Sequence, residues 1–183
     1  MTRSAIRELV FKLLFRVEFQ DIADMDCQAK YFTDDYIERY IEENNIVMPD
    51  EDEKKKKHQS EREAYGFAAE EDENYLAESD DKENPLRGVE ASLDEVKSRA
   101  NEIISLLPDI DKTISDNITG WTIERVGKVE LTIIRLATYE IIHDEDVPNS
   151  VAINEAVELA KKYGQPESSS FINGVLSKIV KNV

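Results

Sequence analysis

The chain has 183 residues, with 40 acidic against 23 basic side chains and a net charge of −17. This length suits one domain with a core of its own, and the single cysteine, Cys27, excludes an internal disulfide. The charge argues against a general nucleic-acid binder, because phosphate contacts need local positive charge. The first twenty residues run the other way, with a net charge of +2.

The N-terminal segment, MTRSAIRELVFKLLF, resembles neither a signal peptide nor a membrane span. Arg7, Glu8 and Lys12 interrupt its apolar residues, and a small-residue cleavage site is missing. Its apolar residues instead recur at helical spacing and predict a helix over residues 2–20. We therefore expect a soluble, cytoplasmic protein that has no contact with a membrane.

Two further helices are predicted on either side of a charged segment, over residues 26–43 and from residue 92 to Pro108, which limits the second one. Residues 50–83 between them hold 6 basic and 14 acidic side chains. Such a composition buries little apolar surface, so we expect disorder or a loose helix there.

The C-terminal part predicts three more helical segments. After a break at Gly120, apolar residues recur at helical spacing over 123–143. The turn DEDVPNS follows and provides Asn149 or Ser150 as the N-cap of the next helix. A last helix is expected over 169–180. Because no segment alternates with period two, the predicted fold class is all-α.

The residue patterns of common catalytic and metal sites are missing. Neither His58 nor His143 has a cysteine or second histidine at ligand spacing. The glycines form no phosphate-binding motif, and no nucleophile, base and oxyanion donor come together in the sequence. We therefore expect no enzyme, no metal and no cofactor.

One edge of the first predicted helix suits single-stranded RNA, because guanidinium groups bind phosphates and aromatic rings stack on bases. Lys12 lies near the end of this edge. The row at i, i+4 spacing comprises Arg3, Arg7, Phe11, Phe15 and Phe19. The alternative is structural: the rings pack in the core and the arginines begin a solvated helix.

A second candidate is the serine run in ESSS, residues 167–170. Hydroxyl groups and unbonded N–H groups at the start of a helix suit a phosphate. Ordinary helix capping by Ser168, Ser169 or Ser170 is the alternative.

The stretch from Gly120 to Ile179 strongly resembles the C-terminal half of the NusB family of bacterial antitermination factors. It contains ERVGKVE, IIRLATYE, VPNSVAINEAVELAKKYG and SFINGVLSKI in the family's order and spacing, and residues 7–15 resemble its N-terminal helix motif. The resemblance implies two roughly perpendicular three-helix bundles. It predicts one NusB-like domain over 1–183, with a divergent acidic insert at about 46–91.

The longest of these motifs, VPNSVAINEAVELAKKYG, is expected to be recognisable because its residues pack against other helices. Small residues allow helices to approach closely. Asn154 and Asn173 are expected to satisfy buried backbone groups, and Gly174 predicts a tight helix crossing. The predicted inward stripe comprises Ile153, Ala156, Val157 and Ala160.

For function, the resemblance implies transcription antitermination without catalysis. NusB-like proteins bind the boxA RNA of ribosomal RNA leader transcripts with the small-subunit ribosomal protein NusE, and the complex joins the transcribing RNA polymerase. Family members occur as monomers and dimers, so a homodimer is one expected state. Partner binding is implied for Glu130. RNA binding is implied for Arg3, Arg7, Lys12, Phe15, Ser168, Ser169 and Ser170.

A second interpretation is a protein-interaction scaffold that binds the ribosomal protein and has little RNA binding of its own. Ser4 and Ile6 stand where further basic residues are common in the family's N-terminal motif. Together with the charge of −17, this thin motif favours the scaffold. Titration with boxA RNA, with and without the ribosomal protein, separates the two interpretations.

Overall fold

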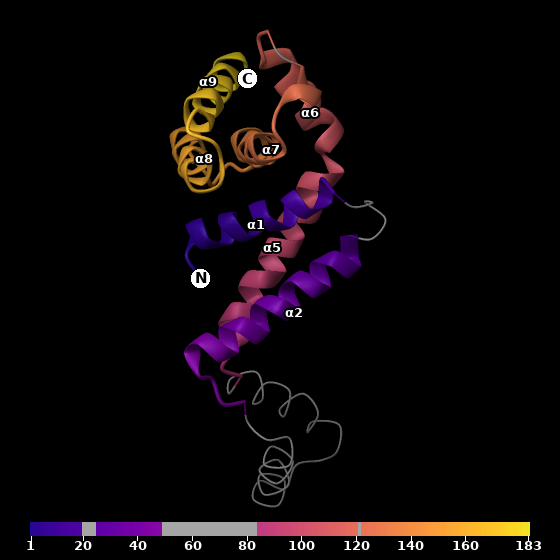
Figure 1. Ribbon diagram of the computed structural model, residues 1–183, viewed down its shortest axis with the longest axis vertical. Coiled ribbons are helices and arrows are strands. Elements are labelled where there is room, and N and C mark those ends of the chain that lie inside the picture. The colour runs from indigo at the N-terminus through magenta and orange to yellow at the C-terminus, as the bar shows by residue number, and fades with distance from the viewer. Residues whose placement is uncertain (20–24, 49–83, 121) are drawn as a thin grey trace, which may run out of the picture. The chain divides into compact units, whose positions relative to one another are not determined.

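A computed structural model describes residues 1–19, 25–48, 84–120 and 122–183 (Figure 1). In these ranges all regular elements are helical, which confirms the predicted all-α class, and none is long and apolar enough to cross a membrane. Residues 50–83, predicted as disordered or loosely helical, lie outside these ranges. The helices are α1 (Arg3–Val17), α2 (Met25–Asn44), α5 (Arg87–Ser105), α6 (Leu107–Asn117), the 3-10 turn η2 (Ile123–Arg125), α7 (Lys128–His143), α8 (Asn149–Tyr163) and α9 (Ser168–Asn182).

Three helix boundaries differ from the predicted ones for local reasons. Pro108 lies in the first turn of α6, where its missing N–H needs no partner, so a full helix follows it. The helix predicted from residue 123 begins one residue after Gly127, which is its N-cap. Neither Asn149 nor Ser150 caps α8: Pro148 takes the N-cap position, with φ −58° and ψ 140°.

The contacts between Cα atoms divide the chain into two compact units. The first comprises Met1–Lys30 and Leu93–Val183, and the second comprises Tyr31–Ser92. Among the described residues of the second unit, the buried apolar side chains are those of Phe32, Leu86 and Val89. The single domain over 1–183 and its insert at about 46–91 stay a prediction, because most of that segment lies outside the described ranges.

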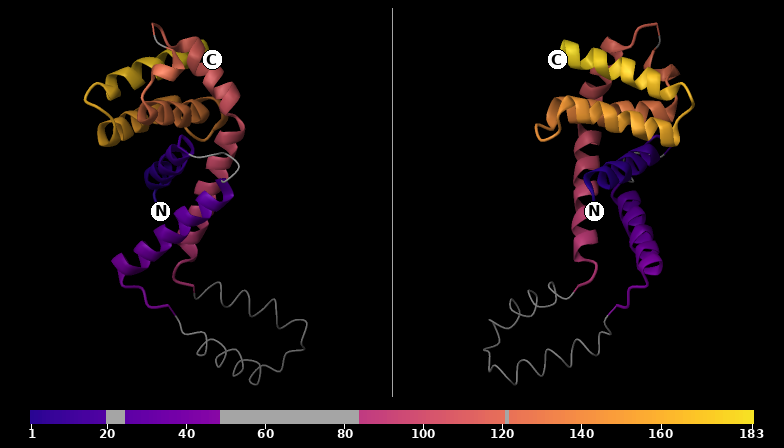
Figure 2. Two further views of the ribbon diagram at one scale, coloured as in Figure 1. Left: turned by 45° about the vertical axis from the view of Figure 1, so that its right-hand side comes forward. Right: turned by 90° about the vertical axis from the view of Figure 1, so that its left-hand side faces the viewer.

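In the first unit α7 is the central helix and packs against α1, α6, α8 and α9 (Figures 1 and 2). Most of its positions are buried, so it is apolar on several faces and has to be covered by neighbouring helices. Removing an isoleucine or leucine side chain from water contributes roughly 1.5–3 kcal/mol. The fully buried apolar residues of α7 and α9 are Ile133, Ile134, Leu136, Ile172, Leu176 and Ile179.

The inward stripe of α8 is shifted from the predicted one, since Ile153 and Val157 are only partly buried. Asn154 and Asn173 are exposed, so neither satisfies a buried backbone group. Gly174 is exposed too, and a Cβ atom there would meet nothing within 4 Å. The predicted tight crossing at Gly174 is therefore wrong. The stripe that is buried comprises Ala152, Ala156, Leu159 and Ala160.

Candidate nucleic-acid interface

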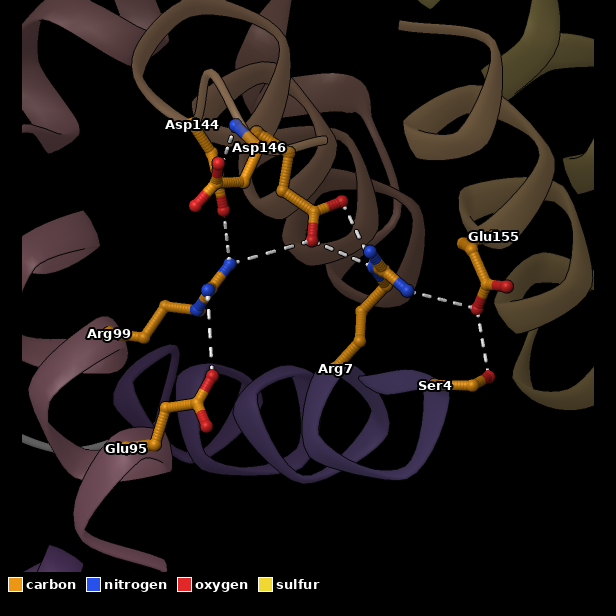
Figure 3. A network of polar contacts seen from close by, with 8 residues as sticks. Ser4, Arg7, Glu95, Arg99, Asp144, Asp146 and Glu155 are labelled. Atoms are coloured by element: carbon orange, nitrogen blue, oxygen red, sulfur yellow. Dashed lines mark hydrogen bonds and ion pairs between the residues drawn. The ribbon is translucent and has the colours of Figure 1, made fainter. Parts of the chain in front are cut away.

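Arg7 is buried at the centre of an ionic network and does not face solvent (Figure 3). Its Nε donates to both carboxylate oxygens of Glu140 on α7, at 2.7 and 3.0 Å. Its Nη1 lies 3.1 Å from Glu155 on α8, and only 7% of the side chain is exposed. The predicted surface position of Arg7 is therefore wrong. A buried arginine needs carboxylate partners, and here those partners occupy the donors that a phosphate would use.

Arg99 of α5 extends the same network (Figure 3). Its guanidinium group lies 2.6 Å from Asp144 and 3.9 Å from Glu140. Burial raises the pKa of Glu140, and Arg7 and Arg99 lower it in part. The network thus ties α1, α5, α7 and α8 together and places a nearly inaccessible carboxylate at the end of α7.

Arg3 behaves differently from Arg7, although one helical turn separates them. Arg3 is exposed at the start of α1 and lines the mouth of a cavity of about 160 Å³ beside the network. In the part of the chain that the structure describes, it makes no ion pair. Its guanidinium group is therefore available to a ligand at the surface.

Lys12 also stays at the surface, where it shares one carboxylate with a lysine of α8. Its side chain is 41% exposed, and its Nζ lies 2.8 Å from Glu8. Glu8 accepts further hydrogen bonds from Lys162, at 2.7 Å, and from the Tyr163 hydroxyl, at 2.6 Å. Burial acts to raise the pKa of Glu8, but the bonds from Lys12, Lys162 and Tyr163 outweigh it and lower the pKa to about 2.

The lowered pKa of Glu8 predicts the pH range in which this cluster stabilises the fold. Its contribution is fully present above the ordinary pKa of 4.5 and is lost as the pH falls toward 2. The difference in unfolding free energy between the natural chain and Glu8→Gln should therefore be constant near neutral pH and shrink between about pH 4.5 and 2. Glu158→Gln, at an exposed carboxylate on α8, is the control and should show no such trend. A Glu8 difference that stays constant down to pH 2 would contradict the assignment.

The aromatic row of α1 runs from the core to the surface. Phe11 is buried, and its ring lies 5.1 Å from that of Tyr163. Phe15 is partly exposed and stacks on Phe11 at 6.1 Å between ring centroids. Phe19 is 66% exposed and meets Phe15 edge to face at 5.1 Å. The structure thus assigns packing to Phe11 and leaves the rings of Phe15 and Phe19 accessible beside Lys12.

The resemblance implied RNA binding for Ser168 and protein-partner binding for Glu130. In the structure the two side chains are hydrogen-bonded to each other. The Ser168 hydroxyl donates to the Glu130 carboxylate and accepts the N–H of Gln165 at 2.8 Å. Ser168 is only 5% exposed, so its hydroxyl serves the fold, and its predicted position on the surface is wrong. Ser169 is partly exposed and Ser170 is exposed.

Two glycines leave room for the Glu130–Ser168 bond. A Cβ atom on Gly164 would lie 2.7 Å from the Ser168 Oγ and 2.8 Å from the Ala160 carbonyl oxygen. A Cβ atom on Gly127 would overlap the Glu130 carboxylate. Both glycines stand in recognisable family motifs, and their absent side chains allow the start of α7 to hold the start of α9.

Next to this bond lies a shallow hollow of about 270 Å³. Phe171 of α9 and the exposed Arg125 line it together with Glu130, Glu167 and Ser168. An aromatic ring beside a guanidinium group suits a stacked base and its phosphate. Neither Phe171 nor Arg125 was predicted from the sequence as a site residue. The available signal was that Phe171 directly follows the serine run.

The described residues form helices around an apolar core, with exposed rings and basic side chains at the surface, which is the character of a helical binding protein. Among the described residues, no group of three or more histidine, cysteine or carboxylate side chains is arranged to hold a metal ion. The NusB family model matches residues 57–181. This chain belongs to the NusB family.

Two relatives match the chain from end to end, and both are named transcription antitermination protein NusB. The one from Agathobacter rectalis is 36% identical over 178 residues, which cover 97% of this chain and 98% of that protein. The one from Lachnoclostridium phytofermentans is 34% identical over 180 residues, with 98% and 99% covered. These names agree with the expectation of a transcription protein. Because the matches span both chains, the acidic segment is not an addition particular to this one.

Solved structures have the same fold. T. maritima NusB superposes with a TM-score of 0.63 at 25% identity, which covers 99% of this chain and 92% of that one. A crystal structure of the antitermination factors NusB and NusE in complex with dsRNA has a TM-score of 0.58 at 20% identity, with 99% and 97% covered. The predicted NusB-like helical fold is confirmed.

Proposed function

We propose that this chain is a cytoplasmic transcription antitermination factor without catalytic activity. It binds the boxA RNA of ribosomal RNA leader transcripts together with the ribosomal protein NusE, and the complex joins the transcribing RNA polymerase. Family membership supports this proposal, as do relatives of the same length that are named for antitermination. The observation that carries RNA binding is the accessible pair of rings, Phe15 and Phe19, beside Lys12.

Two surfaces of the first unit fit single-stranded RNA. On α1, Phe15 stacks on a base while Arg3 and Lys12 bind phosphates. At the start of α9, Phe171 offers a second ring, and Arg125 lies in the same hollow. Ser169 and Ser170 add hydroxyl groups at this helix N-terminus, where the helix dipole favours a phosphate.

Arg7, Ser168 and Glu130 act in this proposal as positioning residues. Arg7 fixes α1 against α7 and α8, and so sets the direction of the aromatic row. The Glu130–Ser168 bond sets the start of α9 relative to the start of α7. The hollow beside that bond is also a candidate contact for NusE, since Glu130 lines it.

Titration with boxA RNA, with and without NusE, tests the proposed function. We expect weak binding by this acidic chain alone and much tighter binding by the mixture. A scrambled RNA of equal length and base composition is the control for non-specific phosphate contacts. Equal affinities for boxA and scrambled RNA in the presence of NusE would refute RNA recognition.

The scaffold interpretation remains the second candidate, and one observation favours it. Arg7, a predicted phosphate ligand, is neutralised inside the fold by two carboxylates in a chain of charge −17. If the scaffold interpretation holds, NusE binds this chain, but the mixture binds boxA no better than NusE alone.

The charge at Glu167 predicts a measurable effect on RNA affinity. Glu167 is exposed, makes no side-chain cap hydrogen bond at the start of α9, and lines the hollow with Arg125 and Phe171. Glu167→Gln should tighten boxA binding by roughly 2- to 5-fold at low salt, because like charges near an exposed interface are worth at most on the order of 1 kcal/mol. Stability should fall slightly, since the carboxylate favours the helix dipole.

Asp94→Asn is the matched control for Glu167→Gln. It removes one charge from α5 at a side chain that is 78% exposed and lines neither proposed RNA surface. The gain from Glu167→Gln should shrink as salt is added, and Asp94→Asn should give little gain at any salt concentration. Equal gains from both variants would mean that only net charge matters and that α9 does not face the RNA.

A further inference from the structure

The exposed face of α9 differs in charge from the rest of this acidic chain. From Ser168 to Val183 the sequence has two lysines and no aspartate or glutamate, whereas acidic residues outnumber basic ones 40 to 23 in the whole chain. The side chains on this face are hydrogen-bond donors or very small. Its exposed positions beyond the first turn are Asn173, Gly174, Lys178, Lys181 and Asn182.

Gly174 has no role in packing that explains it. It lies in the middle of α9, where glycine destabilises a helix relative to alanine. A Cβ atom there would meet nothing within 4 Å, so no neighbouring helix requires the missing side chain. The space at Gly174 is open to the outside, and it allows a ligand to approach the backbone of α9 closely.

A groove leads from Gly174 to the proposed RNA surface. It has a volume of about 300 Å³, runs between the end of α6 and α9, and is lined by Thr119, Ser170, Phe171, Gly174 and Lys178, among others. Lys178 Nζ donates to the Thr119 hydroxyl at 2.8 Å, which holds the ammonium group across the groove. Phe171 lines both this groove and the hollow at the start of α9, so the two depressions lie next to each other at its ring.

We propose that RNA bound at the start of α9 continues along this groove. Its sugar–phosphate backbone lies against Gly174, and Lys178 and Lys181 bind phosphates. The charge of the groove favours an RNA backbone as its ligand. The residues that line it provide an ammonium group, hydroxyl groups and amides but no carboxylate. The inference rests on the proposed RNA-binding function and extends its contact surface by about three helical turns.

Gly174→Ala gives the sharpest test, because the two measured effects have opposite signs. The melting temperature should rise, since alanine favours the helix and meets no neighbour. Affinity for a boxA RNA extended by several nucleotides at both ends should fall several-fold, because the methyl group keeps the RNA backbone away. A residue that only supports the fold would move both quantities in the same direction.

Lys178→Gln tests the phosphate contact. The slope of log affinity against log salt should decrease by roughly 0.7, the value for one contact with a single strand. Lys112→Gln is the matched control, since it removes the same charge from an exposed site on α6 that lines neither depression. It should leave the slope unchanged.

The outcomes separate this inference from the proposed function. If Phe15→Leu weakens RNA binding while Gly174→Ala and Lys178→Gln bind as the natural chain does, the path along α9 is wrong and the proposed function stands. If boxA and scrambled RNA bind with equal affinity in the presence of NusE, RNA recognition itself fails, whatever the variants do. If Gly174→Ala weakens binding of NusE but not of RNA, the groove is a protein contact and the inference is overturned.

Discussion

Replacing Arg7 with alanine is expected to lower the free energy of unfolding by about 3–5 kcal/mol, as is typical when one partner of a buried ion pair is removed. The variant leaves Glu140, which is 1% exposed, without the two hydrogen bonds that Arg7 donates. Since a domain is stable by only about 5–15 kcal/mol, a loss of this size removes much of the total. Denaturant titration of both chains gives the difference directly.

Arg3→Ala is the matched control on the same helix, and its exposed side chain predicts almost no loss of stability. The double variant Arg7→Met, Glu140→Leu should recover a large part of the loss, because apolar side chains can replace a buried pair. If Arg7→Ala is as stable as the natural chain and only its RNA affinity falls, the surface role predicted from the sequence is right and the buried network is wrong.

Replacing Phe15 with leucine is expected to weaken boxA binding in the presence of NusE by roughly 5- to 150-fold, because stacking of one base on an aromatic ring is worth about 1–3 kcal/mol. Leucine keeps most of the apolar contact with Phe11, so the melting temperature should change little. Affinity is measured by titration with labelled RNA at fixed salt.

Phe11→Leu is the matched control for the ring, one helical turn earlier. Phe11 is buried against Tyr163, so its replacement should lower stability and leave RNA affinity nearly unchanged. Comparable losses of RNA affinity in both variants would mean that they act through the position of α1 and that Phe15 does not stack on a base.

The helical class and the family could both be predicted from the amino-acid sequence. Apolar residues at helical spacing predict helices wherever a helix has one covered face, and this rule located α1, α2, α7 and α9 to within a few residues. The motifs around Gly127, Gly164 and Gly174 resemble those of the NusB family. Residue types and their spacing are enough to show this resemblance, whatever each residue contacts in the fold. The expectation of a binding protein rested on residue types together with this resemblance.

Which polar residues at the edge of a helix face are covered depends on tertiary packing and could not be predicted from the sequence. Arg3 and Arg7 are equivalent on a helical wheel, yet Arg7 is buried because Glu140, 133 residues later in the chain, lies opposite it. The bond between Ser168 and Glu130 and the hollow that joins Phe171 to Arg125 likewise depend on helices that are distant in sequence. Periodicity specifies the direction of a side chain from its own helix axis. Its solvent exposure, and therefore its capacity to bind RNA, depends on the helices that pack against that face.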